Sequence, residues 1–322
     1  MKINGIHLSA LLAAALLLGA CQSGDTSSET PEETAPQEET TSPEEAETSS
    51  YTVIDDLEKE VTFEAVPETV VSLIPSNTEI VFALEEGEKL VGVTDYDTYP
   101  EEALEIERIS DSVEFNAERI IQLDPDVVLA YSTGEAPAGL ALLEEADIPV
   151  FVIQSATSFE DVYGDIEQLA AVLAAEEKGE ELIEDIQGQI EEVQQKLASV
   201  EKKQIYFEIS PSPDIYTIGQ STFQQEILDH AQVENIFSDM TGWPSISEEE
   251  VITRNPAVIL SSVTYIEDPI AEMKARSSWD SITAVQEDAI HILDADVTSR
   301  PGPRIGEAVE LVAKAVYPEL ME

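Results

Sequence analysis

Two glutamates repeat at matched positions in the chain, and paired carboxylates of this kind could form charge-assisted hydrogen bonds with a basic partner. The segment 116–131, with Glu118, aligns without a gap on the segment 247–262, with Glu249, and five of sixteen positions are identical. Each copy predicts a capped short helix, an Asx-Pro turn and a buried strand. Packing explains why the apolar residues are identical in the two copies, but it does not explain the identical glutamates. A carboxylate near the start of a helix stabilises the helix dipole, yet any acid would serve that purpose. Two equivalent glutamates on two similar halves suit a two-fold symmetric partner; dipole stabilisation alone is the alternative.

Three aromatic residues lie where a ligand could reach them. Tyr96 follows a predicted strand at 90–93, at the sheet edge where α/β proteins bind ligands. Trp243, one of two tryptophans, lies in a Gly-Trp-Pro loop and on no periodic face. Tyr131 ends the predicted strand of the first repeat. Aromatic faces offer large contact areas at little rotamer cost, so these residues are candidates for binding a flat ligand. Ordinary surface or strand-end aromatics are the alternative.

The segment 296–304 concentrates charge next to a rigid turn. Arg300 and Arg304, two of the six arginines, flank a Pro-Gly-Pro turn, and Asp296 precedes them. In an acidic chain such arginines could bind amide or anionic groups of a ligand. Pairing with neighbouring acids is the alternative, above all for Arg304 at the start of the last predicted helix.

Composition and motifs exclude several classes of protein. With 15 Lys+Arg against 68 Asp+Glu, the net charge of −53 argues against nucleic-acid binding. Three histidines and one cysteine do not suit a multi-ligand zinc or iron–sulfur site, and His230 and His291 are expected to be structural. The sequence has no P-loop, nucleophile elbow or His-Glu-x-x-His pair. We therefore expect no resident cofactor or metal and no enzyme, while an extracellular enzyme or sensor lipoprotein remains a remote alternative.

The amino-terminal fifty residues predict a membrane anchor and a spacer. Residues 8–20 form a short apolar run, which ends in a Leu-Gly-Ala-Cys sequence at Cys21. This pattern resembles the lipobox of bacterial lipoproteins, whose cysteine is acylated, so residues 1–21 are interpreted as a signal peptide. An ordinary signal peptide with an incidental cysteine is the alternative. Residues 22–50 hold nine acids and no basic or aromatic residue, which predicts an extended acidic linker.

The elements that must position these residues form an α/β pattern in two lobes. Short β-rich runs at 51–54 and 61–63 predict a hairpin, and a capping box at Ser76–Glu79 predicts a helix to about residue 84. We expect an N-terminal lobe at 51–165, a connecting helix at 166–200 with a break at Gly179, and a C-terminal lobe at 201–322. The predicted strands are 70–74, 90–93, 127–130, 150–153, 204–209, 258–260 and 290–293, and the last helix is 305–316.

This order of segments resembles the substrate-binding lipoproteins of ABC importers for cobalamin, ferric siderophores and haem. The cobalamin branch is the most similar, through the segments 72–80, 91–100, 115–120, 242–244 and 300–304. The resemblance implies an α/β fold with two Rossmann-like lobes joined by a single long helix, the helical-backbone periplasmic-binding-protein fold. Where that branch can carry a further tryptophan, this chain has Val113. A ferric siderophore or haem therefore stays open as the alternative ligand.

The same resemblance assigns roles to residues and partners. It implies a monomer, lipid-anchored through Cys21 on the outer face of the cell membrane, that delivers a small molecule to a permease dimer with ATPase subunits. Glu118 and Glu249 would bind arginines of the two membrane subunits. The expected ligand-binding residues are Tyr96, Tyr131, Trp243, Asp296, Arg300 and Arg304.

Overall fold

The computed structural model describes residues 50–110, 115–133 and 139–321. The predicted signal peptide, the predicted lipidation site Cys21, the predicted linker up to residue 49, and Val113 lie outside these ranges. Within them, no helix combines the length and apolar character that a membrane span requires.

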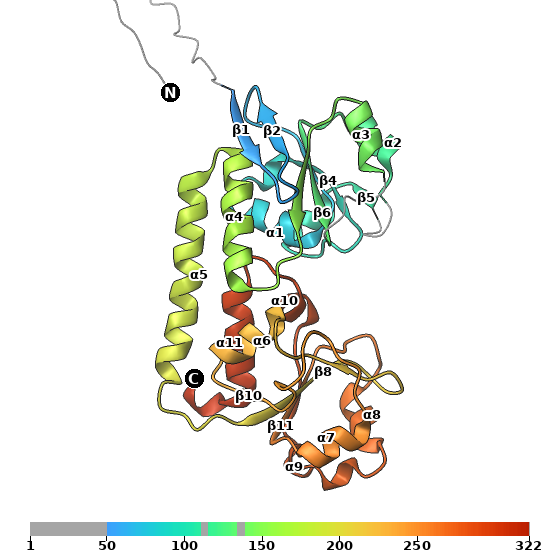
Figure 1. Ribbon diagram of the computed structural model, residues 1–322, viewed down its shortest axis with the longest axis vertical. Helices are drawn as coiled ribbons and strands as arrows, with labels where there is room; N and C mark the ends of the chain where they lie inside the picture. The colour runs from blue at the N-terminus through green and yellow to red at the C-terminus, as the bar shows by residue number, and fades with distance from the viewer. Residues whose placement is uncertain (1–49, 111–114, 134–138, 322) are drawn as a thin grey trace, which may run out of the picture. The chain divides into compact units, whose positions relative to one another are not determined.

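The N-terminal lobe is built on a five-stranded parallel sheet (Figure 1). The strand order is β5-β4-β3-β6-β7, and the antiparallel β1–β2 hairpin precedes it, as predicted. The short strand β5 was not predicted, because three residues give no recognisable alternation. The strands are Tyr51–Ile54 (β1), Glu60–Phe63 (β2), Val70–Ser72 (β3), Leu90–Thr94 (β4), Arg108–Ser110 (β5), Val127–Ser132 (β6) and Val150–Gln154 (β7). The helices are Pro75–Ala83 (α1), Ala117–Leu123 (α2), Leu140–Glu145 (α3) and Phe159–Leu173 (α4), with 3-10 turns at Gly87–Lys89 and Glu101–Glu105.

The C-terminal lobe is built on a second five-stranded sheet. Its parallel strands follow the order β10-β8-β11-β12, and β9 pairs antiparallel with β8. The strands are Gln204–Ser210 (β8), Tyr216–Thr217 (β9), Glu234–Asn235 (β10), Val258–Ser261 (β11) and Ile290–Ile292 (β12). The helices are Phe223–His230 (α6), Glu248–Arg254 (α7), Pro269–Ala275 (α8), Thr283–Gln286 (α9), Ala295–Ser299 (α10) and Ile305–Val316 (α11), with 3-10 turns at Trp279–Ser281 and Pro318–Leu320.

The predicted helix over 166–200 is two helices, and the predicted break at Gly179 is wrong. Helix α4 ends before Ala174, whose φ of 52° is left-handed, and α5 then runs over Glu176–Lys196. Gly179 lies inside α5, where a Cβ atom would come within 2.7 Å of Ala170 Cβ on α4. The glycine therefore allows close packing of the two helices. With 21 residues, α5 is about 32 Å long and alone connects the lobes, instead of the ~50 Å helix that the sequence predicted.

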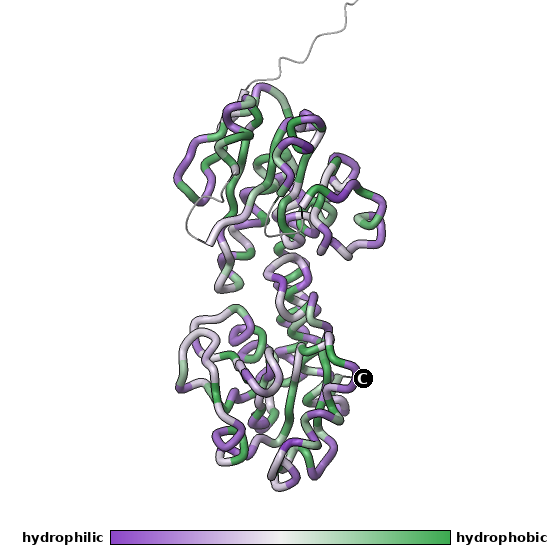
Figure 2. Tube along the Cα trace, turned by 90° about the vertical axis from the view of Figure 1, so that its right-hand side faces the viewer, coloured by the Kyte–Doolittle hydropathy of each residue, from purple (hydrophilic) through white to green (hydrophobic). Residues whose placement is uncertain are grey.

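One continuous apolar core extends through both lobes along the helices. The buried stripe of α5, Ile186, Ile190 and Val193, belongs to the same cluster as residues of α4, α11 and both parallel sheets. Figure 1 shows α5 beside α4 and α11, and Figure 2 shows the apolar residues concentrated along the interior strands. Because close-packed interiors resist deformation, this shared core restricts hinge motion between the lobes.

The start of α1 differs from the prediction. The helix begins at Pro75, its N-cap residue Ile74 makes no side-chain cap, and no capping box forms at Ser76. Proline suits the first helical position because its missing N–H is not needed there. The Glu79 carboxylate, predicted to close the capping box, instead reaches two arginines of the other lobe.

Candidate functional site

A pocket of about 360 Å³ lies between the two lobes. The N-terminal lobe contributes the end of β3, the start of α1 and the segments after β4, β6 and β7, whereas the C-terminal lobe contributes α6, the Trp243 loop and the segment after α10. Although the chain carries 68 acidic residues, none of those within the described ranges lines this pocket. The lining residues are Leu73, Ile74, Pro75, Ser76, Tyr96, Tyr131, Ser155, Ala156, Phe223, Gln224, Trp243, Ser299, Arg300 and Pro301.

Tyr96 lies in a tightly bonded turn after β4. The buried Asp97 carboxylate accepts hydrogen bonds from the Thr94 backbone N–H (2.8 Å) and hydroxyl, and Thr94 Oγ1 accepts one from the Tyr96 N–H (3.1 Å). Arg108 donates to the carbonyls of Thr94 and Asp97, at 2.7 and 3.0 Å. These bonds fix the turn, while the Tyr96 side chain stays 56% exposed at the pocket.

Trp243 faces the same pocket from the other lobe. Its loop turns at Gly242, whose φ of 71° favours glycine, and backbone hydrogen bonds join Gly242 to Gly219 and Gln220. The indole is 50% exposed, and its N–H donates to Gln224 Oε1 at 3.3 Å. Tyr131, near the end of β6, completes an aromatic set drawn from both lobes.

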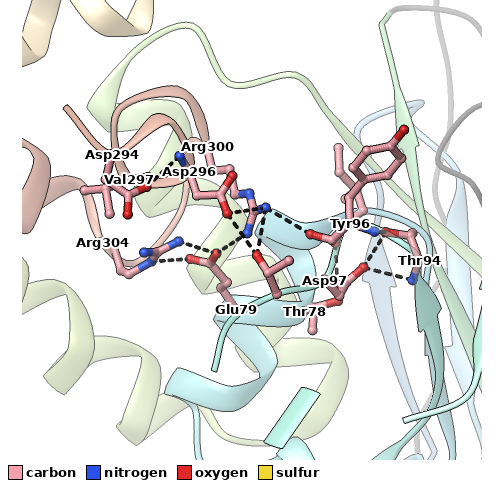
Figure 3. Close-up of polar contacts among 12 residues, drawn as sticks. Thr78, Glu79, Thr94, Tyr96, Asp97, Asp294, Asp296, Val297, Arg300 and Arg304 are labelled. Atoms are coloured by element: carbon pink, nitrogen blue, oxygen red, sulfur yellow. Dashed lines mark hydrogen bonds and ion pairs between the residues drawn. The ribbon is translucent and has the colours of Figure 1, made fainter. Parts of the chain in front are cut away.

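Arg300 lines the pocket but is already paired within the protein (Figure 3). Its guanidinium donates to Glu79 Oε1 at 3.0 Å and to the Tyr96 carbonyl at 2.9 Å, and lies 2.8 Å from Asp296 Oδ2. The Asp296 carboxylate also accepts a hydrogen bond from the Thr98 hydroxyl (2.9 Å). Arg300 is therefore both a lining residue of the pocket and a member of an ion-pair network, whereas Asp296 belongs to the network and does not line the pocket.

Arg304 does not line this pocket either. It donates two hydrogen bonds to Glu79, at 2.8 and 2.6 Å, and its guanidinium lies 4.2 Å from the centre of the Tyr99 ring. Burial favours its neutral form, but the hydrogen bonds and charge of Glu79 outweigh this and raise the Arg304 pKa. Arg304 and Tyr99 border a separate cavity beside α1.

Glu118 and Glu249 are exposed at equivalent positions of α2 and α7. Among the described residues, no hydrogen bond or ion pair engages either carboxylate. In Figure 1 both helices lie on the side opposite α5. Two free carboxylates, one on each lobe, are thus available to a basic partner.

Sequence reasoning missed two kinds of residue at the site. Phe223 and Gln224 line the pocket from the first turn of α6, after the helix cap at Thr222. In the sequence these two residues have only the pattern of an ordinary helix start. Glu79 was assigned to a capping box, although its position between two charged arginines of a distant segment depends on tertiary structure. No local signal identifies such a contact.

The two histidines of the described residues have structural surroundings. His230 stacks on Phe159, with ring centres 4.8 Å apart, and its Nδ1 lies 2.7 Å from Gln194 Nε2. Burial lowers the pKa of His230 and of His291, which favours the neutral ring. Within the described ranges, no group of three or more His, Cys, Asp or Glu side chains is arranged to hold a metal ion.

Comparisons with known proteins match most of the chain. A family model described as periplasmic binding protein matches residues 70–297. The chain is 34% identical over 323 residues to a Bacillus subtilis (strain 168) protein named uncharacterized ABC transporter substrate-binding lipoprotein YvrC, covering 99% of this chain and 98% of the relative. It is 33% identical over 247 residues to a vitamin B12-binding protein of Vibrio cholerae, covering 76% and 87%. A solved structure of a possible iron-binding (periplasmic solute-binding) protein from Staphylococcus epidermidis superimposes with a TM-score of 0.71 at 32% identity, covering 78% of this chain and 99% of that one.

Proposed function

The chain belongs to the periplasmic binding protein family, and we propose that it is the substrate-binding lipoprotein of an ABC importer that captures cobalamin in the pocket between its lobes. The family and the two-lobed α/β fold agree with the expectations from the sequence. The similarity to a vitamin B12-binding protein supports the choice of ligand, and the similarity to a substrate-binding lipoprotein supports the transport role.

The observation that carries this proposal is the composition of the pocket. Tyr96 and Tyr131 of one lobe and Trp243 of the other border a cavity that is lined by no carboxylate of the residues that the structure describes. Aromatic faces suit the broad apolar surface of a macrocycle, and a described lining without acids avoids repelling a ligand phosphate. The cavity would hold only part of a ligand as large as cobalamin. The exposed faces of Tyr96 and Trp243 offer further contact area at the rim of the pocket.

Isothermal titration calorimetry with cyanocobalamin tests this proposal. We expect saturable 1:1 binding by the mature chain, with the compound recovered unchanged, because the protein delivers its ligand without chemistry. An enzyme would convert the compound. Absence of binding at about 50 μM, a concentration at which a micromolar site would be nearly saturated, would contradict the assignment of cobalamin.

A ferric siderophore or haem is the second candidate ligand. The structural similarity to a possible iron-binding protein at 32% identity favours it. Parallel titrations with a ferric hydroxamate siderophore and with haemin separate the candidates. Binding of either one, without binding of cyanocobalamin, would retain the transport role and change the ligand.

The proposed partners are a membrane permease and its ATPase subunits. Glu118 and Glu249 would each bind an arginine of one permease subunit, since charge-assisted hydrogen bonds are stronger than neutral ones. Acylated Cys21 would anchor the monomeric protein to the outer face of the membrane, with residues 22–50 as the spacer. Mass spectrometry of the membrane-extracted protein would detect acylation of its amino-terminal cysteine.

A further inference from the structure

A buried carboxylate of one lobe binds two arginines of the other (Figure 3). The Glu79 side chain on α1 is 1% exposed, and the side chains of Arg300 and Arg304 are 15% and 13% exposed. Glu79 Oε1 accepts from Arg300 Nη1 at 3.0 Å and from Arg304 Nη2 at 2.6 Å, and Oε2 accepts from Arg304 Nε at 2.8 Å. Both carboxylate oxygens are thus engaged across the boundary between the lobes.

The network continues from Arg300 to the turn that carries Tyr96. The second guanidinium nitrogen, Nη2, donates to the Tyr96 carbonyl at 2.9 Å and to Thr98 Oγ1 at 3.2 Å. It also lies 2.8 Å from Asp296. One planar guanidinium therefore joins the buried Glu79 to the backbone of a residue at the pocket rim. Because the guanidinium nitrogens are held in a rigid plane, a shift of the contact with Glu79 also shifts the contact with Tyr96.

We propose that Glu79 is a positioning residue for the pocket, which orients Arg300 so that Arg300 holds the Tyr96 turn against the C-terminal lobe. This inference rests on the proposed function of the pocket. Removal of the Glu79 charge leaves two largely buried guanidinium groups without their shared carboxylate, a costly state that favours their movement toward water. Arg300 would then lose its buried anchor and hold the Tyr96 carbonyl less firmly, and the hydrogen bond from Thr98 to Asp296 would remain as the turn's other contact with the C-terminal lobe.

The C-terminal lobe offers a matched control in a second buried ion pair. Arg276 donates to both carboxylate oxygens of Glu208, at 2.6 and 3.0 Å, and the two side chains are 3% and 0% exposed. This pair lies within one lobe, and neither residue lines the pocket. Glu208→Gln therefore disturbs a comparable carboxylate–guanidinium contact without touching the Tyr96 turn.

A double-mutant cycle with cyanocobalamin separates positioning from general destabilisation. We expect Glu79→Gln to weaken binding by about tenfold and to speed dissociation, because Arg300 then holds the Tyr96 turn less firmly. In a Tyr96→Ala background the same substitution should change affinity by less than about threefold. Glu208→Gln should lower the melting temperature and leave affinity within about twofold of the original chain. An equal effect of Glu79→Gln in both backgrounds would overturn the inference.

Hydrogen–deuterium exchange of the ligand-free chain tests the same idea without any ligand. Amides of residues 94–98 should exchange faster in Glu79→Gln than in the original chain, because the hydrogen bonds within the turn then lack the support of Arg300, and at the original rate in Glu208→Gln. Unchanged exchange in Glu79→Gln would overturn the positioning role even if cyanocobalamin binds. Accelerated exchange in a chain that binds no cyanocobalamin would retain the positioning role and reject the proposed ligand.

Discussion

Glu118 and Glu249 are each the second residue of a seven-residue helix, one in each lobe. Both helices begin at a side-chain cap and end at a left-handed residue, Asp124 with φ 50° and Asn255 with φ 46°, before a proline and a buried strand. The repeat in the sequence is thus a repeat in the structure. The packing of the repeat accounts for the helices and strands, and leaves the two exposed glutamates free for another role.

Replacement of both glutamates tests that role. The double substitution Glu118→Ala and Glu249→Ala should leave ligand affinity unchanged, because neither residue lines the pocket. Binding to the permease in proteoliposomes should fall by more than about tenfold, since two charge-assisted contacts are lost. Pull-down and ligand uptake measure these effects.

The control for this experiment is the pair Glu181→Ala and Glu191→Ala on the exposed surface of α5. It removes the same charge from the opposite side of the molecule (Figure 1). Equal loss of uptake in both double variants would indicate a general charge effect and contradict a specific docking role.

Trp243→Ala tests the aromatic wall of the pocket. Loss of the indole should weaken cyanocobalamin binding by roughly 1–3 kcal/mol, the range of an aromatic hot spot, with little change in the melting temperature because the side chain is half exposed. Tyr265→Ala is the matched control, since Tyr265 is 71% exposed and does not line the pocket. Calorimetry that gives the same affinity for Trp243→Ala as for the original chain would remove Trp243 from the site.

The sequence predicted elements well where local patterns determine them. The hairpin and the last helix agree with the structure because alternation and helical periodicity reflect burial directly. The break between α4 and α5 was predicted at the wrong residue. It lies at Ala174, whose left-handed conformation is not expected for an alanine. Gly179 was read as a helix breaker although it serves close packing, a role that depends on the neighbouring helix.

The sequence predicted which aromatic residues lie at the candidate site but not the ion-pair network beside them. Tyr96, Tyr131 and Trp243 do line one pocket, since sheet topology and loop position place them at the same edge. Arg300 lines this pocket and Arg304 does not, and both bind Glu79, which is more than two hundred residues away in the sequence. Pairing over that separation follows from the fold as a whole, so no local pattern could predict it.

Asp165 should make the stability of the fold depend on pH. The residue is buried in α4, and burial, together with the charges of Asp56 and Asp161, raises its pKa from 3.8 to about 8. Between these values the folded state retains a proton that the unfolded chain releases, so stability falls as pH rises, by up to about 1.4 kcal/mol per pH unit from this group. Asp165→Asn should remove that contribution and be the more stable form at pH 9.

Urea denaturation at pH 5, 7 and 9 measures this difference. Asp185→Asn, at an exposed position of α5, serves as the control and should keep the original pH slope. Parallel curves for Asp165→Asn and the original chain would show that Asp165 is ionised in the folded state, contrary to the prediction.

Net charge should make the fold depend on salt. Residues 51–322 carry 59 acids against 14 bases, a formal charge of −45, and self-repulsion of this size opposes the compact state. At about 1 M salt the Debye length is only ~3 Å, so most of this repulsion is screened. The urea midpoint should therefore rise between 0.1 and 1 M NaCl.

Glu181→Lys with Glu191→Lys makes the charge four units less negative and should reduce that rise, whereas Glu181→Gln with Glu191→Gln should reduce it about half as much. A midpoint that did not respond to NaCl, or equal slopes in all three chains, would show that local ion pairs and not net repulsion determine the stability.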